Sequence, residues 1–128
     1  MSPRYLTMII PSRWFAGGKG LDEFRREMLN DSKIRKLVDF ENANDCFPGV
    51  DIAGGICYFL WDRDHAGLCE VVNIVNGKES MTTRPLDEFK TFIRNGKSVQ
   101  IIHKVTAAGD DWMSTQVSSS KPFGLRTF

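Results

Sequence analysis

The chain has 128 residues, of which 41% are hydrophobic and 26% charged, a composition typical of one globular domain with a buried core, which excludes a disordered protein. Seventeen basic residues against 16 acidic ones leave a formal net charge of +1, so any contact with nucleic acid must come from local patches. No apolar run reaches the roughly 20 residues that span a bilayer, and the N-terminus is not laid out as a signal peptide. We therefore expect a cytoplasmic protein without a membrane partner.

The first part of the chain alternates predicted strands with one predicted helix. Residues 5–10 (YLTMII) predict a short buried strand that ends at Pro11, because proline cannot continue a central ladder. After a Gly-rich turn, apolar residues at helical spacing predict a helix over 21–29, and IRKLVDF predicts the next strand over 34–40. A helix between two strands is typical of a parallel sheet.

The next part begins with a long polar loop. Residues 41–55 (ENANDCFPGVDIAGG) are crowded with Asn, Asp, Pro and Gly, and a loop of this length is usually functional or mobile. Two apolar runs, 56–61 and 68–74, flank the polar segment DRDHAG and predict an antiparallel β-hairpin at the edge of the sheet. A candidate edge strand follows over 78–86, and apolar spacing over 87–106 predicts one or two helices.

The cysteines and histidines do not form a metal-binding pattern. Cys46, Cys57 and Cys69 are an odd number without a C-x-x-C pair, and His65 and His103 have no partner at ligand spacing. We therefore expect no metal site and no disulfide framework. The thiols are predicted to pack as small apolar residues.

The Gly-rich turn at 17–20 raises the question of a phosphate-binding loop. The segment AGGKGL matches neither G-x-x-x-x-G-K-[ST] nor G-x-G-x-x-G. Two interpretations stay open. In one, the amides of the helix N-terminus, together with Arg13 and Lys19, hold an anion such as a DNA phosphate. In the other, the glycines only satisfy the geometry of a strand-to-helix connection.

The long loop contains one aromatic residue, Phe47, directly before Pro48-Gly49. A ring presented on a rigid turn can stack on a nucleobase; the alternative is a ring that folds back onto the core.

The acids Asp62 and Asp64 lie in a predicted turn, and those of PLDEFK lie at a predicted helix start. Since no set of nucleophile and base is present, we predict no catalytic residue in this chain and no basis for a metal-dependent nuclease.

Four motifs follow one another along nearly the whole chain: PSRW, GGKGL-x-EFR, FP-x-VDI-x-GG-x-x-YF and PFG. In this order they resemble the C-terminal part of the methyltransferase domain in adenine-specific DNA methyltransferases of type II restriction-modification systems. Some of those enzymes join methylase and endonuclease in one polypeptide. The resemblance implies an α/β fold, namely the second half of a Rossmann-like S-adenosylmethionine-dependent methyltransferase fold with a terminal antiparallel β-hairpin.

The resemblance also implies what the chain lacks. In that family the cofactor site is a Gly-containing loop after the first strand, and the catalytic site is a [DN]-P-P-[YF] tetrapeptide after the fourth. The tetrapeptide is absent, since all five prolines are isolated, and a strand followed by the Gly-containing cofactor segment is absent as well. S-Adenosylmethionine is therefore expected for the parent enzyme but not bound to this chain, which begins near the fifth strand. The family flips its target adenine out of the duplex and stacks it between the tetrapeptide's aromatic and a second aromatic, whose position matches Phe47.

These implications divide the chain at residue 78. Residues 1–78 are predicted to be the C-terminal portion of the catalytic domain, and residues 79–128 the start of the connection to the DNA target-recognition region. Candidate contacts to DNA phosphates, each with ordinary surface charge as the alternative, are Arg13, Lys19, Lys104, Lys121 and Arg126.

Expected partners are double-stranded DNA and the rest of the methyltransferase polypeptide. A restriction endonuclease, or a second copy of the chain paired through an exposed sheet edge, is a further option. The alternative function is a stand-alone nucleic-acid-binding or protein-interaction module without catalysis.

Overall fold

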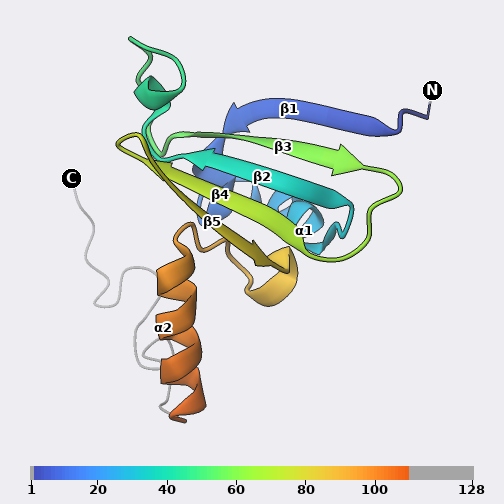
Figure 1. Cartoon of the computed structure of the whole chain (residues 1–128), viewed down its shortest axis with the longest axis vertical. Helices are drawn as coiled ribbons and strands as arrows, with labels where there is room; N and C mark the ends of the chain where they lie inside the picture. Colours follow the sequence, from blue (N-terminus) through green and yellow to red (C-terminus); the bar gives the residue numbers. More distant parts are fainter. Residues whose placement is uncertain (1, 110–128) are drawn as a thin grey trace. The chain divides into compact units, whose positions relative to one another are not determined.

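The computed structural model describes residues 2–109. The chain divides into two compact units, Met1–Ser98 and Val99–Phe128. The first unit holds a five-stranded sheet and helix α1 (Figure 1). Helix α2 (Gly96–Ala107) begins at the end of the first unit, and the second unit is described as far as residue 109. Within residues 2–109, no helix is both long enough and apolar enough to cross a membrane.

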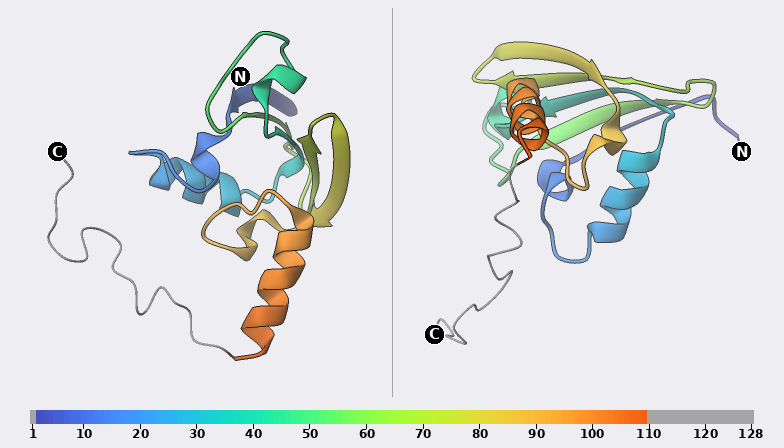
Figure 2. Two further views of the ribbon diagram at one scale, coloured as in Figure 1. Left: turned by 90° about the vertical axis from the view of Figure 1, so that its left-hand side faces the viewer. Right: turned by 90° about the horizontal axis from the view of Figure 1, so that it is seen from below.

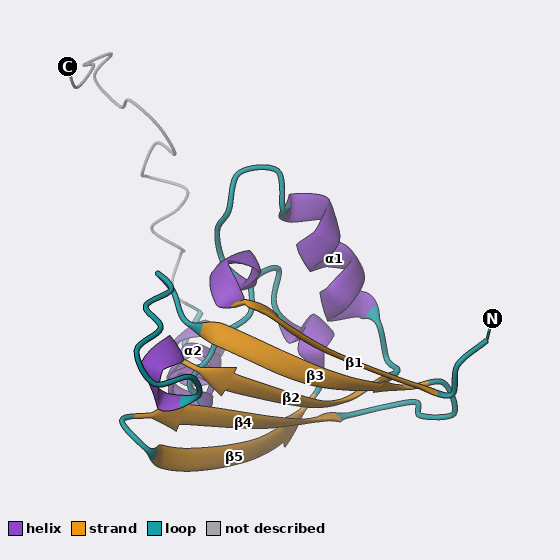
Figure 3. Cartoon of the chain, turned by 90° about the horizontal axis from the view of Figure 1, so that it is seen from above, coloured by secondary structure: helices purple, strands orange, loops and turns teal. Residues whose placement is uncertain are grey.

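The sheet is mixed, with the strand order β1-β3-β2-β4-β5 (Figure 3). Strand β3 lies antiparallel between β1 and β2, β4 runs parallel to β2, and β5 is antiparallel to β4. This arrangement confirms a mixed α/β fold. The strands are β1 (Tyr5–Pro11), β2 (Ile34–Phe40), β3 (Ile56–Asp62), β4 (Cys69–Val75) and β5 (Lys78–Arg84).

Helix α1 (Asp22–Asn30) connects β1 to β2 on one face of the sheet (Figure 2). The predicted helix is confirmed, and Asp22 and Glu23 occupy its first turn, where the helix dipole favours acids. β1 and β2 run in the same direction because both are antiparallel to β3. They are not neighbours, however, so the parallel pairing that the strand-helix-strand order predicted is not formed between them.

The predicted hairpin between 56–61 and 68–74 is wrong. These runs form β3 and β4, but β2 lies between them in the sheet. The hairpin is instead β4–β5, in which Val75 pairs with Lys78 across the two-residue turn Asn76-Gly77. Both turn residues have positive φ (51° and 74°), the conformation that Asn-Gly favours in tight hairpins. The turn signal was present in the sequence, whereas the six-residue DRDHAG connection leaves its flanking strands free to pair elsewhere.

Strand β1 is confirmed in position but not in burial. Four of its apolar side chains are between 44% and 54% exposed: Tyr5, Leu6, Met8 and Ile9. Within the described part of the chain, β1 pairs only with β3. Its second edge therefore has no neighbour there, and its apolar residues stay open to solvent.

The main core lies on the face of the sheet that α1 covers. Alternating residues of the central strands face α1 and the short helix η1 (Ser12–Phe15), as the two-residue period of a strand requires. The most deeply buried members are Trp14, Ile34, Leu37, Cys57, Cys69 and Val71. A second, smaller cluster on the alternate positions contains Val38, Val72 and Ile74, with Phe40 and Tyr58 beside them.

The segment after the sheet is less helical than predicted. β5 confirms the candidate edge strand, and the short helix η3 (Leu86–Glu88) follows it. Of the one or two helices expected over 87–106, α2 is formed, and it begins only at Gly96. Residues 89–95 are non-helical.

Candidate functional site

The loop of residues 41–55 projects from one end of the sheet (Figure 1) and is held in shape by its own asparagines. The side chain of Asn42 accepts a hydrogen bond from the Asn44 amide at 3.0 Å, and the side chain of Asn44 accepts one from the Gly49 amide at 2.6 Å. Between them, Ala43–Asp45 form the short helix η2. The polar composition that predicted a loop thus serves to satisfy its backbone.

Phe47 lies at the turn of this loop. Its amide donates to the Ala43 carbonyl at 2.9 Å, and its carbonyl accepts from the Val50 amide at 3.0 Å. The backbone is therefore fixed, yet the side chain is 42% exposed and belongs to neither core cluster. The interpretation in which Phe47 folds onto the core is wrong, whereas its stacking role stays a prediction.

A buried carboxylate lies beneath the loop. Asp39, in β2, has no exposed surface. Arg94 donates to both of its oxygens, through Nε and Nη2, each at 2.7 Å. Ser12 Oγ donates at 3.1 Å and Asn73 Nδ2 at 3.0 Å. A charge that has left water needs such partners, because an unpaired one is strongly destabilising.

Arg94 is matched to this site. Burial by itself would lower its pKa, but the hydrogen bond and the charge of Asp39 outweigh burial and raise the pKa of Arg94 above its ordinary value. Its guanidinium also lies over the Phe15 ring, 5.3 Å from the centroid, in the manner of a cation–π contact. Sequence analysis missed both Asp39 and Arg94. The signal for Asp39 was a lone acid in the apolar strand IRKLVDF, but nothing in the sequence identified its partner.

The Gly-rich turn is held by Arg25 of α1. Arg25 Nε donates to the Trp14 carbonyl at 2.6 Å, Nη2 donates to the Gly17 carbonyl at 2.5 Å, and Nη1 pairs with Asp22 at 2.7 Å. The side chain of Arg25 is 9% exposed. A turn tied in this way has a structural explanation that requires no ligand.

Arg13 and Lys19 are nevertheless brought together. Both are exposed and both line a hollow of about 500 Å³ beside the turn. Its other lining residues are mostly apolar, including Ile10, Trp14 and Phe24. The hollow therefore combines an apolar floor with two cations, and a contact to a phosphate remains a prediction.

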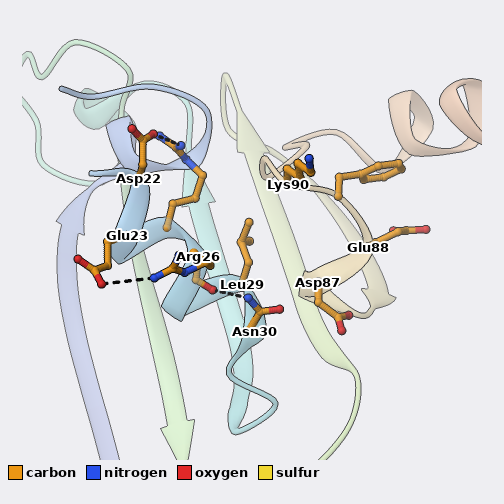
Figure 4. A pocket seen from close by; sticks show the side chains of 10 residues that line it. Asp22, Glu23, Arg26, Leu29, Asn30, Asp87, Glu88 and Lys90 are labelled. Atoms are coloured by element: carbon orange, nitrogen blue, oxygen red, sulfur yellow. Dashed lines mark hydrogen bonds and ion pairs between the residues drawn. The ribbon is translucent and has the colours of Figure 1, made fainter. Parts of the chain in front are cut away.

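A larger hollow of about 750 Å³ lies between α1 and η3 (Figure 4). It is lined by acids and bases of α1, by the acids Asp87 and Glu88 of η3, and by Lys90 beyond η3. Several charges of α1 are already paired. Arg26 bonds Glu23 at 3.3 Å, and the side chain of Asn30 donates to the Arg26 carbonyl at 2.8 Å. Over residues 2–109, no group of three His, Cys, Asp or Glu side chains is placed to hold a metal ion.

The remaining candidates are spread along the chain. Lys104 is exposed on α2, in the second unit, and its contact to DNA stays a prediction. Lys121 and Arg126 lie outside the described residues. Cys57 and Cys69 are buried members of the main core, as predicted, and burial raises the pKa of Cys57 to about 11 and that of Cys69 to about 12.

The chain is similar in sequence to known methylases. Residues 1–47 match the family model described as Eco57I restriction-modification methylase. A 68-residue segment is 38% identical to an uncharacterized adenine-specific methylase of Mycoplasma pneumoniae. The resemblance to adenine-specific restriction-modification methylases is confirmed. The match to the Mycoplasma methylase covers 52% of this chain and 16% of that protein.

The match to the Eco57I methylase family model includes the elements that precede Phe47 in the chain. It spans β1, α1, β2 and the first part of the long loop. A solved structure, the methyltransferase subunit of a type I restriction-modification system from Streptococcus thermophilus, is similar over 84% of this chain and 21% of its own. The sequence identity is 11% and the TM-score 0.37, which is too distant to support a structural argument.

Proposed function

We propose that the chain is the C-terminal part of the catalytic domain of a site-specific DNA adenine methyltransferase, in which Phe47 stacks on the flipped target adenine. The parent enzyme transfers a methyl group from S-adenosylmethionine to the exocyclic amine of that base. The observation that carries the proposal is an exposed aromatic ring on an anchored loop, in a chain whose first 47 residues match a methylase family.

The open edge of β1 supports the finer proposal that this is the second half of a Rossmann-like sheet. An apolar strand that pairs on one side only exposes hydrogen-bonding groups and apolar surface together. The preceding strands of the parent domain are the natural neighbour for that edge. A second copy of the chain is the alternative occupant.

The residues that line the hollow beside the Gly-rich turn do not fit S-adenosylmethionine. The hollow beside the Gly-rich turn carries Arg13 and Lys19 and no carboxylate among its lining residues, whereas the methyl donor is a positively charged sulfonium. Because this chain contains neither the Gly loop nor the tetrapeptide, we assign cofactor binding and the amine's hydrogen-bond acceptors to another part of the parent protein. What this chain supplies is one face of the base-binding site.

Titration of labelled S-adenosylmethionine into the 128-residue chain tests whether this chain binds the cofactor. We expect no binding, because neither the Gly loop nor the tetrapeptide is present. Micromolar affinity would mean that the chain has been assigned to the wrong part of the fold.

Substitution of Phe47 tests the stacking role. Base–aromatic stacking is worth about 1–3 kcal/mol, so Phe47→Ala in the complete reading frame should lower methylation by roughly 5- to 150-fold. Phe47→Trp keeps a stacking surface and should retain most of the activity. Since the recognition sequence is unknown, the readout is the N6-methyladenine content of host DNA, measured by mass spectrometry after limited expression.

Val50→Ala is the matched control for this experiment. Val50 lies in the same loop and is 38% exposed, but it offers no aromatic face. We expect its variant to methylate as the parent does. Equal activity of Phe47→Ala and Val50→Ala would contradict the proposed stacking.

A further inference from the structure

We propose that Asp39 and Arg94 form a positioning pair that fixes both ends of the 41–55 loop and thereby the place of Phe47. The loop has its own hydrogen bonds near Phe47, but its direction relative to the sheet depends on how its ends are held. The contacts around Asp39 reach the first residue of the loop and the last two. The final step, from loop geometry to methylation, rests on the proposed function.

The C-terminal end of the loop is held twice. Arg94 Nη2 donates to the Gly54 carbonyl at 2.8 Å while it also bonds Asp39. The Ser12 amide donates to the Gly55 carbonyl at 3.0 Å, and the Ser12 hydroxyl donates to Asp39. Two groups that bind the same carboxylate therefore each hold one of the two final loop carbonyls.

The N-terminal end of the loop is joined to the same carboxylate. Asn73 Nδ2 lies 3.0 Å from Asp39 Oδ2 and 3.1 Å from Glu41 Oε1. The Glu41 amide also donates to the Ile74 carbonyl at 3.2 Å. Through Ser12, Asn73 and Arg94, Asp39 is thus connected to both ends of the loop.

Arg94 is itself held in place by the residues around it. Phe92 is 4% exposed in the main core, and its amide donates to the Phe15 carbonyl at 2.7 Å. Arg84 of β5 donates to the Ile93 carbonyl and lies over the Phe92 ring. The segment that carries Arg94 is therefore anchored independently of the loop, so Arg94 acts as a fixed support for Gly54.

Hydrogen exchange of the 128-residue chain tests the positioning role. Arg94→Met alone leaves a buried, uncompensated carboxylate that threatens the whole fold. The principal variant is therefore the double substitution Asp39→Asn with Arg94→Met. It removes both charges, and each new side chain is similar in size to the one it replaces. We expect exchange of amides in residues 41–55 to accelerate by about tenfold or more, while amides of β4 keep their protection.

A second variant and a matched control make the result specific. Arg94→Lys keeps the charge but loses the planar fork, so its loop should exchange at a rate between those of the parent and the double variant. Arg25→Met removes another arginine that holds backbone carbonyls, those of Trp14 in η1 and Gly17 in the Gly-rich turn. It should loosen residues 16–21 without affecting the 41–55 loop. Unchanged loop exchange in the double variant, or equal acceleration of the loop and β4, overturns the positioning role.

The exchange measurement is independent of methylation. If the loop loosens as expected but Phe47→Ala leaves methylation unchanged, the positioning pair stands and the proposed function fails. If the loop does not respond, the positioning pair fails whatever the activity of the Phe47 variants.

Discussion

Gly55, the last residue of the long loop, offers a sharp test of how the loop meets the sheet. Gly54 and Gly55 both adopt positive φ, 86° and 79°, so alanine at either site incurs a left-handed cost of about 1–2 kcal/mol. Their surroundings differ. A Cβ at Gly54 would meet nothing within 4 Å, whereas one at Gly55 would lie 2.1 Å from the Phe40 carbonyl oxygen and 2.7 Å from that of Glu41.

The clash at Gly55 is with backbone and cannot be relieved by a rotamer change. The chain must shift by about 1 Å to bring the 2.1 Å contact to the 3.0 Å that a Cβ tolerates. We expect this shift to break the hydrogen bond from the Ser12 amide to Gly55 at 3.0 Å, a loss of about 1 kcal/mol. Adding strain in the flanking strands, we expect Gly55→Ala to lower the free energy of unfolding by about 3 kcal/mol or more. Gly54→Ala should lower it by only about 1 kcal/mol, because a smaller unfolded-state entropy offsets part of its strain.

Urea unfolding measures the difference. Trp14 is 1% exposed, so its fluorescence should report loss of the core, and linear extrapolation yields the free energy for each variant. The reasoning is refuted if the two alanine variants unfold within about 0.5 kcal/mol of each other, since their φ angles match and only the steric term separates them.

Three further predictions concern the core. At pH 8 a thiol reagent should modify the half-buried Cys46 first and reach Cys57 and Cys69 only after unfolding; rapid modification of all three would contradict their burial. Because burial raises the pKa of Cys57 from 9.0 to about 11 and that of Cys69 to about 12, the unfolded thiols ionise first. The free energy of unfolding should therefore be insensitive to these groups below about pH 8 and fall between about pH 9 and 12, with a flat profile as the opposing result. Leu37→Ala, at a site with no exposure, should destabilise by about 2–5 kcal/mol. Leu68→Ala, at 52% exposure, should cost less than about 0.5 kcal/mol, and similar losses in both variants would refute the assigned core.

Local patterns predicted most of the elements. Helix α1 follows from apolar spacing after a Gly-rich turn, and β2 follows from IRKLVDF. These predictions agree with the structure because each depends only on residues that are close together in the sequence. The hairpin was misassigned for the same reason: two apolar runs indicate strands, but periodicity within a strand carries no information about its partner.

The candidate site likewise has one part that the sequence indicated and one part that it did not. The sequence indicated that the Asn- and Gly-rich loop contains one aromatic residue, and the resemblance to methylases selected Phe47 within it. The support beneath that loop was beyond sequence reasoning. Asp39 and Arg94 are 55 positions apart, and an ion pair across that separation forms only once the sheet and the segment after β5 are in place.

By itself, the sequence determined the α/β elements, the polar loop and the methylase resemblance, all of which are properties of contiguous segments. Only the tertiary structure decided the strand order, the exposure of Phe47 and the junction of both loop ends at one buried carboxylate. The physical reason is that burial and pairing depend on which surfaces meet. A carboxylate such as Asp39 is stable in the interior only because Ser12, Asn73 and Arg94 converge on it from three separate parts of the chain.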